Sequence, residues 1–331
     1  MKNFKKLKKI FFIAEIGNNH EGNIKNALKL IDQAKISGAD AVKFQTFDTN
    51  LFINKSEKKG FKRLKKFEFT KNQFKRLSIY SKKKKLKFIS TPLDLESAKF
   101  LSTLVDVFKI SSGDNNFYEL IEFCARFKKP IIISTGMLEF KEIKKIIQFL
   151  KRIKFPIYKL AILHCVSDYP VKDNEVNLLS IKFLNEKLKV TTGYSDHSLG
   201  GDACLAAISL GAKIIEKHFT LDNNFSKFRD HHLSLNPKDM KSTINSLRRI
   251  ELMMGIYNKK ISKSEKKNLN SMRRSLYFNQ NLKKNTILEK RHIKIVRPFR
   301  KLKPNNLAKI LGRKLKKNVK ESEIVSFKSL K

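Results

Sequence analysis

Short apolar runs alternate with longer amphipathic stretches from the start of the chain to about Leu221. Apolar residues recur at three- and four-residue steps in the longer stretches, which is the helical period, and the short runs are rich in β-branched and aromatic residues. The predicted strands are Ile10–Ile16, Ala41–Thr46, Leu86–Thr91, Val107–Ser111, Pro130–Thr135, Lys159–Cys165, Lys189–Tyr194 and Lys213–Phe219. The predicted helices include Asn23–Ser37, Lys71–Lys84, Phe117–Phe127, Leu199–Leu210 and, after the last strand, Pro237–Met254. Eight strands separated by helices predict a parallel sheet that closes into a (β/α)₈ TIM barrel, an α/β fold.

Three further segments complete the predicted organisation. The stretch from Asp48 to Phe69 is long for a loop between a strand and a helix, and we expect it to lie over the barrel mouth. Polar, lysine-rich Lys259–Asn270 is typical of a linker, and the short segments after Ser275 predict a small, mainly β module. We therefore divide the chain into a barrel domain (1–258), a linker (259–274) and a C-terminal domain (275–331), which is small enough to need a docking partner.

The charge of the chain is strongly positive, because 72 Lys and Arg residues face 30 Asp and Glu residues for a formal net charge of +42. Such a balance normally suggests a polyanionic partner. Here the lysines are spread over nearly every segment, Asn, Ile and Phe are also common, and no nucleic-acid-reading motif accompanies them. Codon bias in an AT-rich genome would produce this whole pattern, so we do not expect a nucleic-acid partner.

Apolar runs and cysteines indicate the compartment. No apolar run approaches the roughly 18 residues that a membrane helix needs, so we expect no membrane association. A basic N-terminus precedes the apolar run that begins at Ile10, but this run stops at Glu15 without a cleavage site for a signal peptidase. We therefore expect a cytoplasmic protein. Cys124, Cys165 and Cys204 form neither a CxxC pair nor a zinc spacing, which favours buried, reduced thiols.

Polar residues collect where the predicted strands end, which is where the chemistry of a TIM barrel takes place. Glu15, Lys43, Lys109 and Glu216 lie inside otherwise apolar strands. A buried charge is costly unless it is paired or used, and four charges at one barrel mouth are hard to explain as structural alone. The alternative is a buried stabilising network.

Two kinds of binding chemistry follow from these strand ends. Two inward lysines with neighbouring hydroxyls and glycines suit a phosphate and a carboxylate. His197 and His218 end neighbouring strands, and two imidazoles with open positions suit a divalent metal ion that acts as a Lewis acid. Beside the adjacent pair His231-His232, Asp230 is the better contact candidate, and we interpret His292 as a surface residue.

Long motifs run in order through the predicted barrel. They are FIAEIGNNH at 12–20, GADAVKFQT at 38–46, STP at 90–92, KISSG at 109–113, STGM at 134–137, LHC at 163–165, GYSDH at 193–197 and EKHFT at 216–220. Together these motifs resemble those of the sialic acid synthase family. The C-terminal stretch resembles the antifreeze-like (SAF, β-clip) module that these synthases carry.

The resemblance implies a role for each matched residue. His197 and His218 would hold a divalent metal ion, with Mn²⁺ expected before Mg²⁺ or Co²⁺, and Glu15 would be a catalytic carboxylate with Asp114 beside it. The positions that bind phosphoenolpyruvate in the family are matched by Lys43, Thr91, Lys109, Ser112, Ser134 and Ser195. The positions on the side of the amino sugar are matched by Gln45, Ser167, Tyr169, Asp230 and Arg297. Arg297 would reach the barrel of a partner subunit, which implies a domain-swapped homodimer.

Two departures from the family pattern leave the sugar open, and a third bears on how Arg297 is positioned. Asp114 stands where neuraminate-type enzymes often have Glu, Ser167 stands where some have Asn, and the loop at 299–304 lacks the usual glycine-containing turn after the Arg-Pro pair. The acceptor is N-acetylmannosamine, giving N-acetylneuraminate, or 2,4-diacetamido-2,4,6-trideoxy-mannose, giving legionaminate. Pseudaminate is less favoured, because the motif EIG at 15–17 resembles the other two branches better.

Two alternatives of a different class remain at this point. One is a barrel aldolase or lyase that uses Lys43 or Lys109 to form a Schiff base. The other is a protein without catalytic activity that binds polyanions through its positive charge. The complete set of strand-end residues favours the synthase over both.

Overall fold

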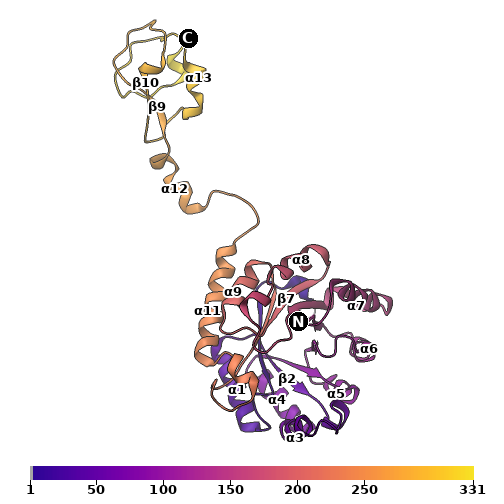
Figure 1. The fold of residues 1–331 in the computed structure, drawn as a ribbon. Helices are drawn as coiled ribbons and strands as arrows, with labels where there is room; N and C mark the ends of the chain where they lie inside the picture. Colours follow the sequence, from indigo (N-terminus) through magenta and orange to yellow (C-terminus); the bar gives the residue numbers. More distant parts are fainter. Residues whose placement is uncertain (1–2) are drawn as a thin grey trace. The chain divides into compact units, whose positions relative to one another are not determined.

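The computed structural model describes residues 3–331, and the chain folds into two compact units. The first unit ends at Gly255 and the second is Ile256–Lys331 (Figure 1). Met1 and Lys2 of the basic N-terminal stretch lie outside the described residues. Each unit has an apolar core of its own, so the two are described separately.

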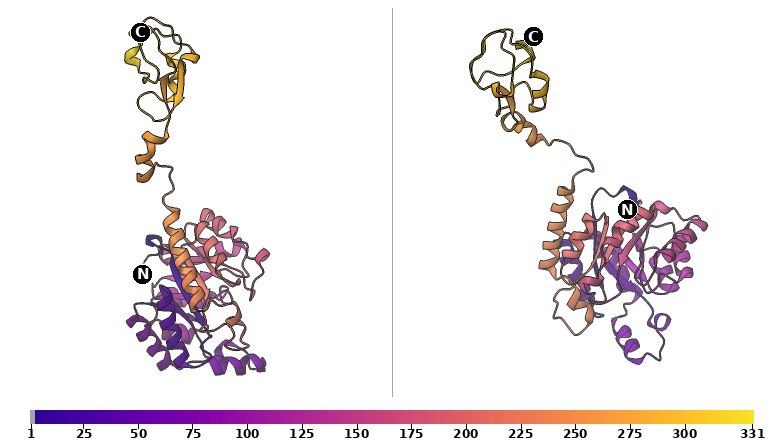
Figure 2. Two further views of the ribbon diagram at one scale, coloured as in Figure 1. Left: turned by 90° about the vertical axis from the view of Figure 1, so that its left-hand side faces the viewer. Right: turned by 45° about the horizontal axis from the view of Figure 1, so that its top comes forward.

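The first unit is a closed barrel of eight parallel strands, in which each strand pairs with the next along the chain and β8 pairs with β1 (Figure 2). The predicted TIM barrel is confirmed, and each predicted strand overlaps an observed one. The strands are β1 (Phe11–Gly17), β2 (Ala41–Thr46), β3 (Lys87–Pro92), β4 (Val107–Ile110), β5 (Ile131–Ser134), β6 (Leu160–Cys165), β7 (Thr191–Asp196) and β8 (Ile214–His218).

Helices connect the strands and cover the outside of the barrel. They are α1 (Ile24–Ser37), α2 (Thr49–Phe52), α3 (Lys58–Phe67), α4 (Lys71–Lys83), α5 (Leu95–Leu101), α6 (Tyr118–Arg126), α7 (Phe140–Arg152), α8 (Leu179–Lys187), α9 (Asp202–Ser209), α10 (Arg229–Leu233) and α11 (Pro237–Met254). Short 3₁₀ turns are η1 (Phe4–Lys6), η2 (Ile157–Lys159) and η3 (Asp173–Glu175).

Helix α1 illustrates why these segments are helical. Asn23 caps its first turn by accepting hydrogen bonds from two backbone N–H groups, and Gly38 ends it in the left-handed conformation at φ 92°. Leu30, Ile31 and Ala34 recur at helical spacing on its buried face. The same period, read along the sequence, predicts this helix to within a residue at its start.

Apolar side chains fill both faces of the barrel wall. Alternate strand residues face inward, and near the amino ends of the strands they form an interior cluster that includes Ile13, Ala41 and Ile214. Phe4 belongs to the same cluster and is 1% exposed, so the segment before β1 closes that end of the barrel. A larger cluster joins the outward-facing strand residues to the helices.

The segment after β2 contributes to the barrel mouth. It contains α2 and α3, and side chains from both lie around the cavity at the carboxyl ends of the strands. Phe52, Arg63 and Phe67 are among them. The expectation that residues 48–69 lie over the mouth is therefore confirmed.

The second unit begins with a helix where the sequence suggested only a linker. Helix α12 (Lys263–Met272) occupies most of the polar stretch Lys259–Asn270. Ser262 and Glu265 form a reciprocal capping box, in which each side chain accepts a hydrogen bond from the other residue's backbone N–H. This Ser-x-x-Glu pattern is visible in the sequence and predicts the start of a helix, whereas the polar composition alone suggests a linker. None of the residues of α12 is buried within the chain.

The rest of the second unit is a small β module, as predicted. Strands β9 (Ser275–Phe278) and β10 (Ile293–Val296) pair antiparallel, an isolated bridge joins Tyr277 of β9 to Ile324, and further bridges join the segments that follow. Short helical elements are η4 (Lys290–His292), η5 (Pro304–Asn306), α13 (Leu307–Ile310) and η6 (Phe327–Ser329). The prediction that His292 is a surface residue is wrong: it is 5% exposed, and its Nδ1 accepts a hydrogen bond from Glu289 N–H at 3.1 Å.

Two expectations from composition can be compared with the structure. Cys124, Cys165 and Cys204 are all buried and form no disulfide among the described residues, as predicted. Within residues 3–331, no helix has the length and apolar character needed to cross a bilayer. Neither finding depends on how the two units are arranged.

Candidate active site

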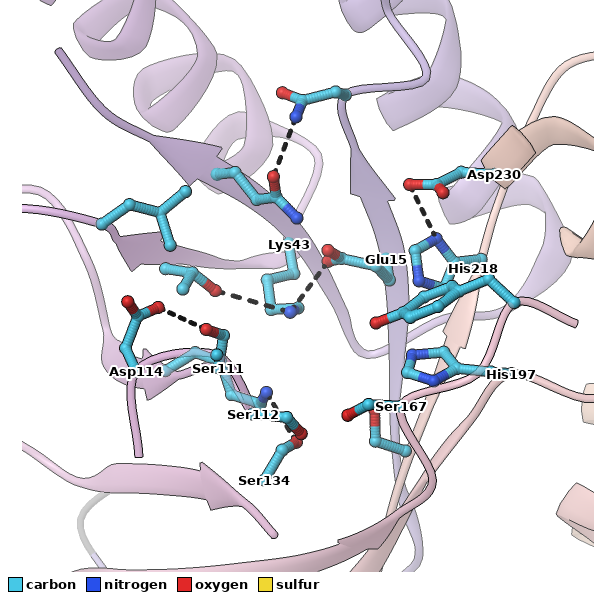
Figure 3. A pocket seen from close by; sticks show the side chains of 18 of the residues that line it. Glu15, Lys43, Ser111, Ser112, Asp114, Ser134, Ser167, His197, His218 and Asp230 are labelled. Carbon is cyan, nitrogen blue, oxygen red and sulfur yellow. Dashed lines mark hydrogen bonds and ion pairs between the residues drawn. The ribbon is translucent and has the colours of Figure 1, made fainter. Parts of the chain in front are cut away.

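A cavity of about 540 Å³ opens at the carboxyl ends of the barrel strands. Its walls combine strand-end side chains with residues from α3 and α10. Figure 3 shows Asp230 of α10 beside the strand-end residues. This volume suits small-molecule ligands, and the polar groups converge at its floor. The cavity is therefore the place to locate the residues predicted from the sequence.

The structure brings nearly all of the predicted site residues together. Those that line the cavity are Glu15, Lys43, Gln45, Thr91, Lys109, Ser112, Asp114, Ser134, Ser167, Tyr169, Ser195, His197, His218 and Asp230. Arg297 is the exception: it lies in the second unit, directly after β10. The positions are thus established for the barrel residues, while their individual roles stay predictions.

Four buried charges form the floor of the cavity. Lys43 Nζ lies 3.2 Å from a carboxylate oxygen of Glu15 and 3.1 Å from one of Glu216. Lys109 Nζ lies 3.4 Å from the same oxygen of Glu216. All four side chains are at most 5% exposed, so the two lysines and two glutamates balance one another with little help from water.

This cluster separates the two glutamates in acidity. Burial, assisted by the charge of Glu216 and opposed by Lys43, raises the pKa of Glu15 to about 7. Burial also opposes ionisation of Glu216, but Lys109 and Lys43 outweigh it and lower the pKa of Glu216 to about 2. Near neutral pH, Glu216 is therefore a fixed negative charge, whereas Glu15 can gain or lose a proton.

The lysines differ in the same way. Burial lowers the pKa of Lys109, and the attraction of Glu216 only partly offsets it. Burial also acts against the charge of Lys43, but Glu15 and Glu216 together raise its pKa. Lys43 thus remains protonated between two carboxylates. Lys109 has less negative charge around it, and an anionic ligand would supply the negative charge that is missing.

Hydroxyl groups surround Lys109. Its Nζ donates to Ser134 Oγ at 2.8 Å, and Ser112 Oγ accepts the backbone N–H of Gly136 at 3.1 Å. A Cβ atom on Gly136 would come within 2.1 Å of Ser167 Oγ and 2.7 Å of Ser112 Oγ, so both hydroxyls converge over this glycine. An ammonium group and several hydroxyls at one wall form a cradle for the oxygen atoms of an anion.

Ser167 lies close to this wall as well. Its Oγ and that of Ser112 both approach Gly136, and its role on the sugar side stays a prediction. The oxygen is buried and has no hydrogen-bond partner among the described residues. A ligand oxygen at this wall would supply one, because buried hydroxyls in proteins are normally hydrogen-bonded.

The two histidines meet at the opposite wall. The ring centroids of His197 and His218 are 5.3 Å apart. His197 Nδ1 lies 2.7 Å from the carbonyl of Val166, so this nitrogen donates and Nε2 is left as a possible ligand. Burial, reinforced by His197, lowers the pKa of His218 well below its ordinary value, which keeps this imidazole neutral and able to bind a metal.

A divalent metal ion fits these donors. His218 Nδ1 is buried without a hydrogen-bond partner, and Asp230 Oδ2 lies 3.9 Å from it. No three His, Cys, Asp or Glu side chains within residues 3–331 are arranged to hold a metal by themselves. Two imidazoles with a nearby carboxylate would therefore leave coordination positions for substrate or water, as a catalytic metal site requires.

Aromatic and amide side chains shape the outer part of the cavity. Tyr169 packs against His197 with ring centroids 4.0 Å apart, and the guanidinium of Arg229 lies 4.5 Å above the Tyr169 ring. Asn18 Nδ2 donates to Gln45 Oε1 at 2.8 Å. Asp114 accepts a short hydrogen bond from Ser111, and burial raises the pKa of Asp114.

Several lining residues have no role in the sequence prediction. Glu216 and Asn18 were recognisable as strand-end polar residues, and Glu216 also shares a face of β8 with His218. Arg63, Phe228 and Arg229 come from helices and loops that overhang the mouth. These three residues lie outside the strands, so the strand pattern of the sequence does not predict that they line the cavity.

Comparisons with known proteins agree with this arrangement. The model of the NeuB family matches residues 30–259, and that of the SAF domain matches residues 273–331. The chain is 38% identical to the N,N'-diacetyllegionaminic acid synthase of Campylobacter jejuni, over 96% of this chain and 99% of the relative. It is 34% identical to the pseudaminic acid synthase of the same organism, over 96% of each.

A solved structure is similar as well. The N-acetylneuraminic acid (sialic acid) synthetase of Leptospira borgpetersenii, crystallised with citrate, shares 34% identity and superposes with a TM-score of 0.75. The match covers 79% of this chain and 90% of that protein. With the family model spanning most of the barrel and relatives above 30% identity over nearly the whole chain, the chain belongs to the NeuB family of nonulosonic acid synthases.

Proposed function

We propose that the chain condenses phosphoenolpyruvate with an N-acylated amino hexose and water, giving a nonulosonic acid and inorganic phosphate. As a NeuB-family synthase it is a phosphoenolpyruvate-dependent condensing enzyme. The observation that carries the finer proposal is the meeting of two buried lysines and two buried histidines in one cavity. One wall suits an anion and the other suits a metal-bound oxygen atom.

The sugar we favour is 2,4-diacetamido-2,4,6-trideoxy-mannose, which would give legionaminic acid. Similarity to a N,N'-diacetyllegionaminic acid synthase over nearly the full length of both chains supports it. Asp114, one methylene shorter than the Glu often found there in neuraminate-type enzymes, also supports a different acceptor. N-acetylmannosamine and the pseudaminate precursor are the competitors, because relatives with these product names are also similar.

Phosphoenolpyruvate would occupy the wall around Lys109. Lys43 and Lys109 would neutralise its carboxylate and phosphate, and Thr91, Ser112, Ser134 and Ser195 would donate hydrogen bonds. Thr91 Oγ1 lies 3.5 Å from Lys43 Nζ, and Ser195 Oγ donates to Glu216 at 3.1 Å. Thr91 accepts from Lys43, so its own hydroxyl proton is free for the anion, whereas Ser195 would have to turn its hydroxyl away from Glu216 to donate to the ligand.

The open-chain sugar would lie between this wall and the histidines. Gln45, Tyr169 and Asp230 would orient it, with its aldehyde directed at the histidine pair. His197 and His218 would hold a divalent metal ion, Mn²⁺ first and Mg²⁺ or Co²⁺ as alternatives. When bound, this ion supplies Lewis-acid polarisation of the aldehyde oxygen.

The bond changes then balance as follows. Carbon three of phosphoenolpyruvate forms a bond to the aldehyde carbon, whose oxygen takes up a proton. Carbon two becomes electron-poor and water adds there, giving up its first proton. The bond between carbon two and the phosphate oxygen then breaks as the added hydroxyl passes its remaining proton to the departing phosphate and becomes the carbonyl of carbon two. Glu15, with its pKa raised to about 7, is the group that would accept the proton of the water. Asp114 is the second carboxylate available at the mouth.

The second unit would complete the site of another subunit. We propose that Arg297 reaches the barrel of a partner chain in a domain-swapped homodimer and meets the N-acyl group of the sugar there. Its place directly after β10, in a unit separate from the barrel, supports this proposal. Family membership favours the synthase over the Schiff-base aldolase and the polyanion-binding protein.

A substrate panel tests the proposal. Phosphate release from phosphoenolpyruvate should require an acylamino hexose, and kcat/KM should be highest with the diacetamido-trideoxy mannose. N-acetylmannosamine and the pseudaminate precursor are the matched competitors in the same coupled phosphate assay. Highest turnover with either competitor would overturn the choice of sugar, and phosphate release without any sugar would contradict the condensation itself.

Removal of either histidine tests the metal assignment. We expect His197→Ala and His218→Ala to lose turnover by at least about 100-fold, because each variant removes one of the two histidine ligands and thereby weakens metal binding. His232→Ala is the control, since His232 is exposed in the same region. Chelation should abolish wild-type turnover and Mn²⁺ should restore it. Full activity in chelator would refute a metal role.

The pKa of Glu15 makes a prediction about stability. Its folded-state pKa of about 7 exceeds its ordinary 4.5, so the folded chain binds this proton more tightly and loses stability as the pH rises from about 4.5 to 7. Glu15→Gln cannot ionise. It should have a free energy of unfolding higher than wild type by up to about 3 kcal/mol at pH 8, with the gap closing toward pH 5.

Glu216→Gln is the matched control with the opposite sign. The pKa of Glu216 is lowered to about 2, so its ionised form stabilises the fold at all pH values above the ordinary 4.5. This variant should be less stable than wild type at pH 8. Urea denaturation at pH 5, 6, 7 and 8 measures both, and a Glu15→Gln variant no more stable than wild type at pH 8 would contradict the assignment.

A further inference from the structure

A buried ion pair lies behind the histidines, on the outer side of the barrel wall. Lys217 Nζ is 2.9 Å from Asp196 Oδ2, and both side chains are fully buried. The two residues are direct partners in the register of β7 and β8. Neither lines the cavity, and the proposed chemistry uses neither of them.

The pair is part of a network that ties down the loop after β7. Asp196 Oδ1 accepts hydrogen bonds from Tyr194 Oη at 2.9 Å, from Ser198 N–H at 2.8 Å and from Ser198 Oγ at 2.7 Å. Lys217 Nζ donates a short hydrogen bond to the carbonyl of Ser198. Cys204 of α9 lies with its Sγ 3.2 Å from Asp196 Oδ2. Both backbone polar groups of Ser198 are therefore fixed by this one ion pair.

The position of the pair in the chain gives the network a second consequence. Asp196 immediately precedes His197, and Lys217 immediately precedes His218. Because adjacent strand residues point to opposite faces, the ion pair lies on the helix side of the wall while both imidazoles lie in the cavity. His197 is thus held between two anchored residues, Asp196 and Ser198. The strand that carries His218 is tied to Asp196 through Lys217, the residue immediately before His218.

We propose that Asp196 and Lys217 are positioning residues that set the separation and orientation of His197 and His218 for the metal ion. The inference rests on the metal role given to these histidines in the proposed function. A buried ion pair adds little net stability compared with apolar side chains of the same size, so stability does not account for it. An ion pair with defined hydrogen bonds fixes the relative position of the two strands that carry the histidines more specifically than apolar packing would.

Mn²⁺ binding to the metal-free full-length protein tests the inference without relying on turnover. Free Mn²⁺ is followed by electron paramagnetic resonance as MnCl₂ is added, and the melting temperature is measured on the same samples. We expect Asp196→Asn and Lys217→Met to raise the Kd for Mn²⁺ by about 10- to 100-fold, the range found when groups that support metal ligands are removed.

Asp40→Asn is the matched control for lost stability. Asp40 pairs with Arg248 at 2.6 Å and accepts the N–H of Phe12, at the opposite end of the barrel from the histidines. This variant should lower the melting temperature and leave the Kd for Mn²⁺ unchanged. Equal loss of Mn²⁺ affinity in Asp40→Asn and Asp196→Asn would show that the network acts only through general stability, and would overturn the inference.

A milder variant covers the case in which the charged positions do not tolerate substitution. Tyr194→Phe removes one hydrogen bond to Asp196 and leaves the ion pair intact. It should weaken Mn²⁺ binding by about three- to tenfold. Unchanged affinity in every folded variant would refute the positioning role while leaving the metal assignment in place. A wild-type chain that binds no Mn²⁺ would instead refute the metal assignment, and the inference with it.

Discussion

Two lysines and two glutamates buried at the barrel mouth are the constraint on which the rest of the site depends. Lys43 bridges Glu15 and Glu216, and Lys109 contacts Glu216 from the other side. Buried charges of this kind persist only when they are paired, and each of the four has an oppositely charged partner within 3.4 Å. We propose that the phosphate and carboxylate of the ligand bind at this charged floor.

The same cluster divides the cavity by chemistry. Ser134 accepts a hydrogen bond from Lys109 and the hydroxyls of Ser112 and Ser167 converge on Gly136, whereas the imidazoles of His197 and His218 lie at the ends of β7 and β8. Gly136 allows the hydroxyls of Ser112 and Ser167 to approach closely, and behind the histidines lie the Val166 carbonyl that accepts from His197 and the ion pair of Asp196 with Lys217. Burial raises the pKa of Glu15 at a cost in stability near neutral pH, and this raised pKa suits the role of base that we propose for it.

Much of this arrangement could be predicted from the sequence, because period and strand position are local properties. The eight strands follow from short apolar runs, and residues near strand ends must meet at one barrel mouth. What sequence could not supply depends on contacts between distant segments. Arg63 and Arg229 enter the cavity from overhanging segments, and Ser167 faces Ser112 because the loop after β6 folds back on Gly136. His292 is buried for the same kind of reason, and α12 forms because of a capping box that composition alone hides.

We propose that the cluster around Lys43 and Lys109 is the phosphoenolpyruvate site, and a binding measurement without any sugar tests this proposal most directly. Calorimetric titration of phosphoenolpyruvate should show a Kd at least about tenfold higher for Lys109→Met than for wild type, since a charge-assisted contact is lost. Lys109→Met/Glu216→Gln removes the partner charge as well and should bind equally weakly, which separates lost attraction from an unpaired carboxylate. Wild-type affinity in either variant would contradict the account.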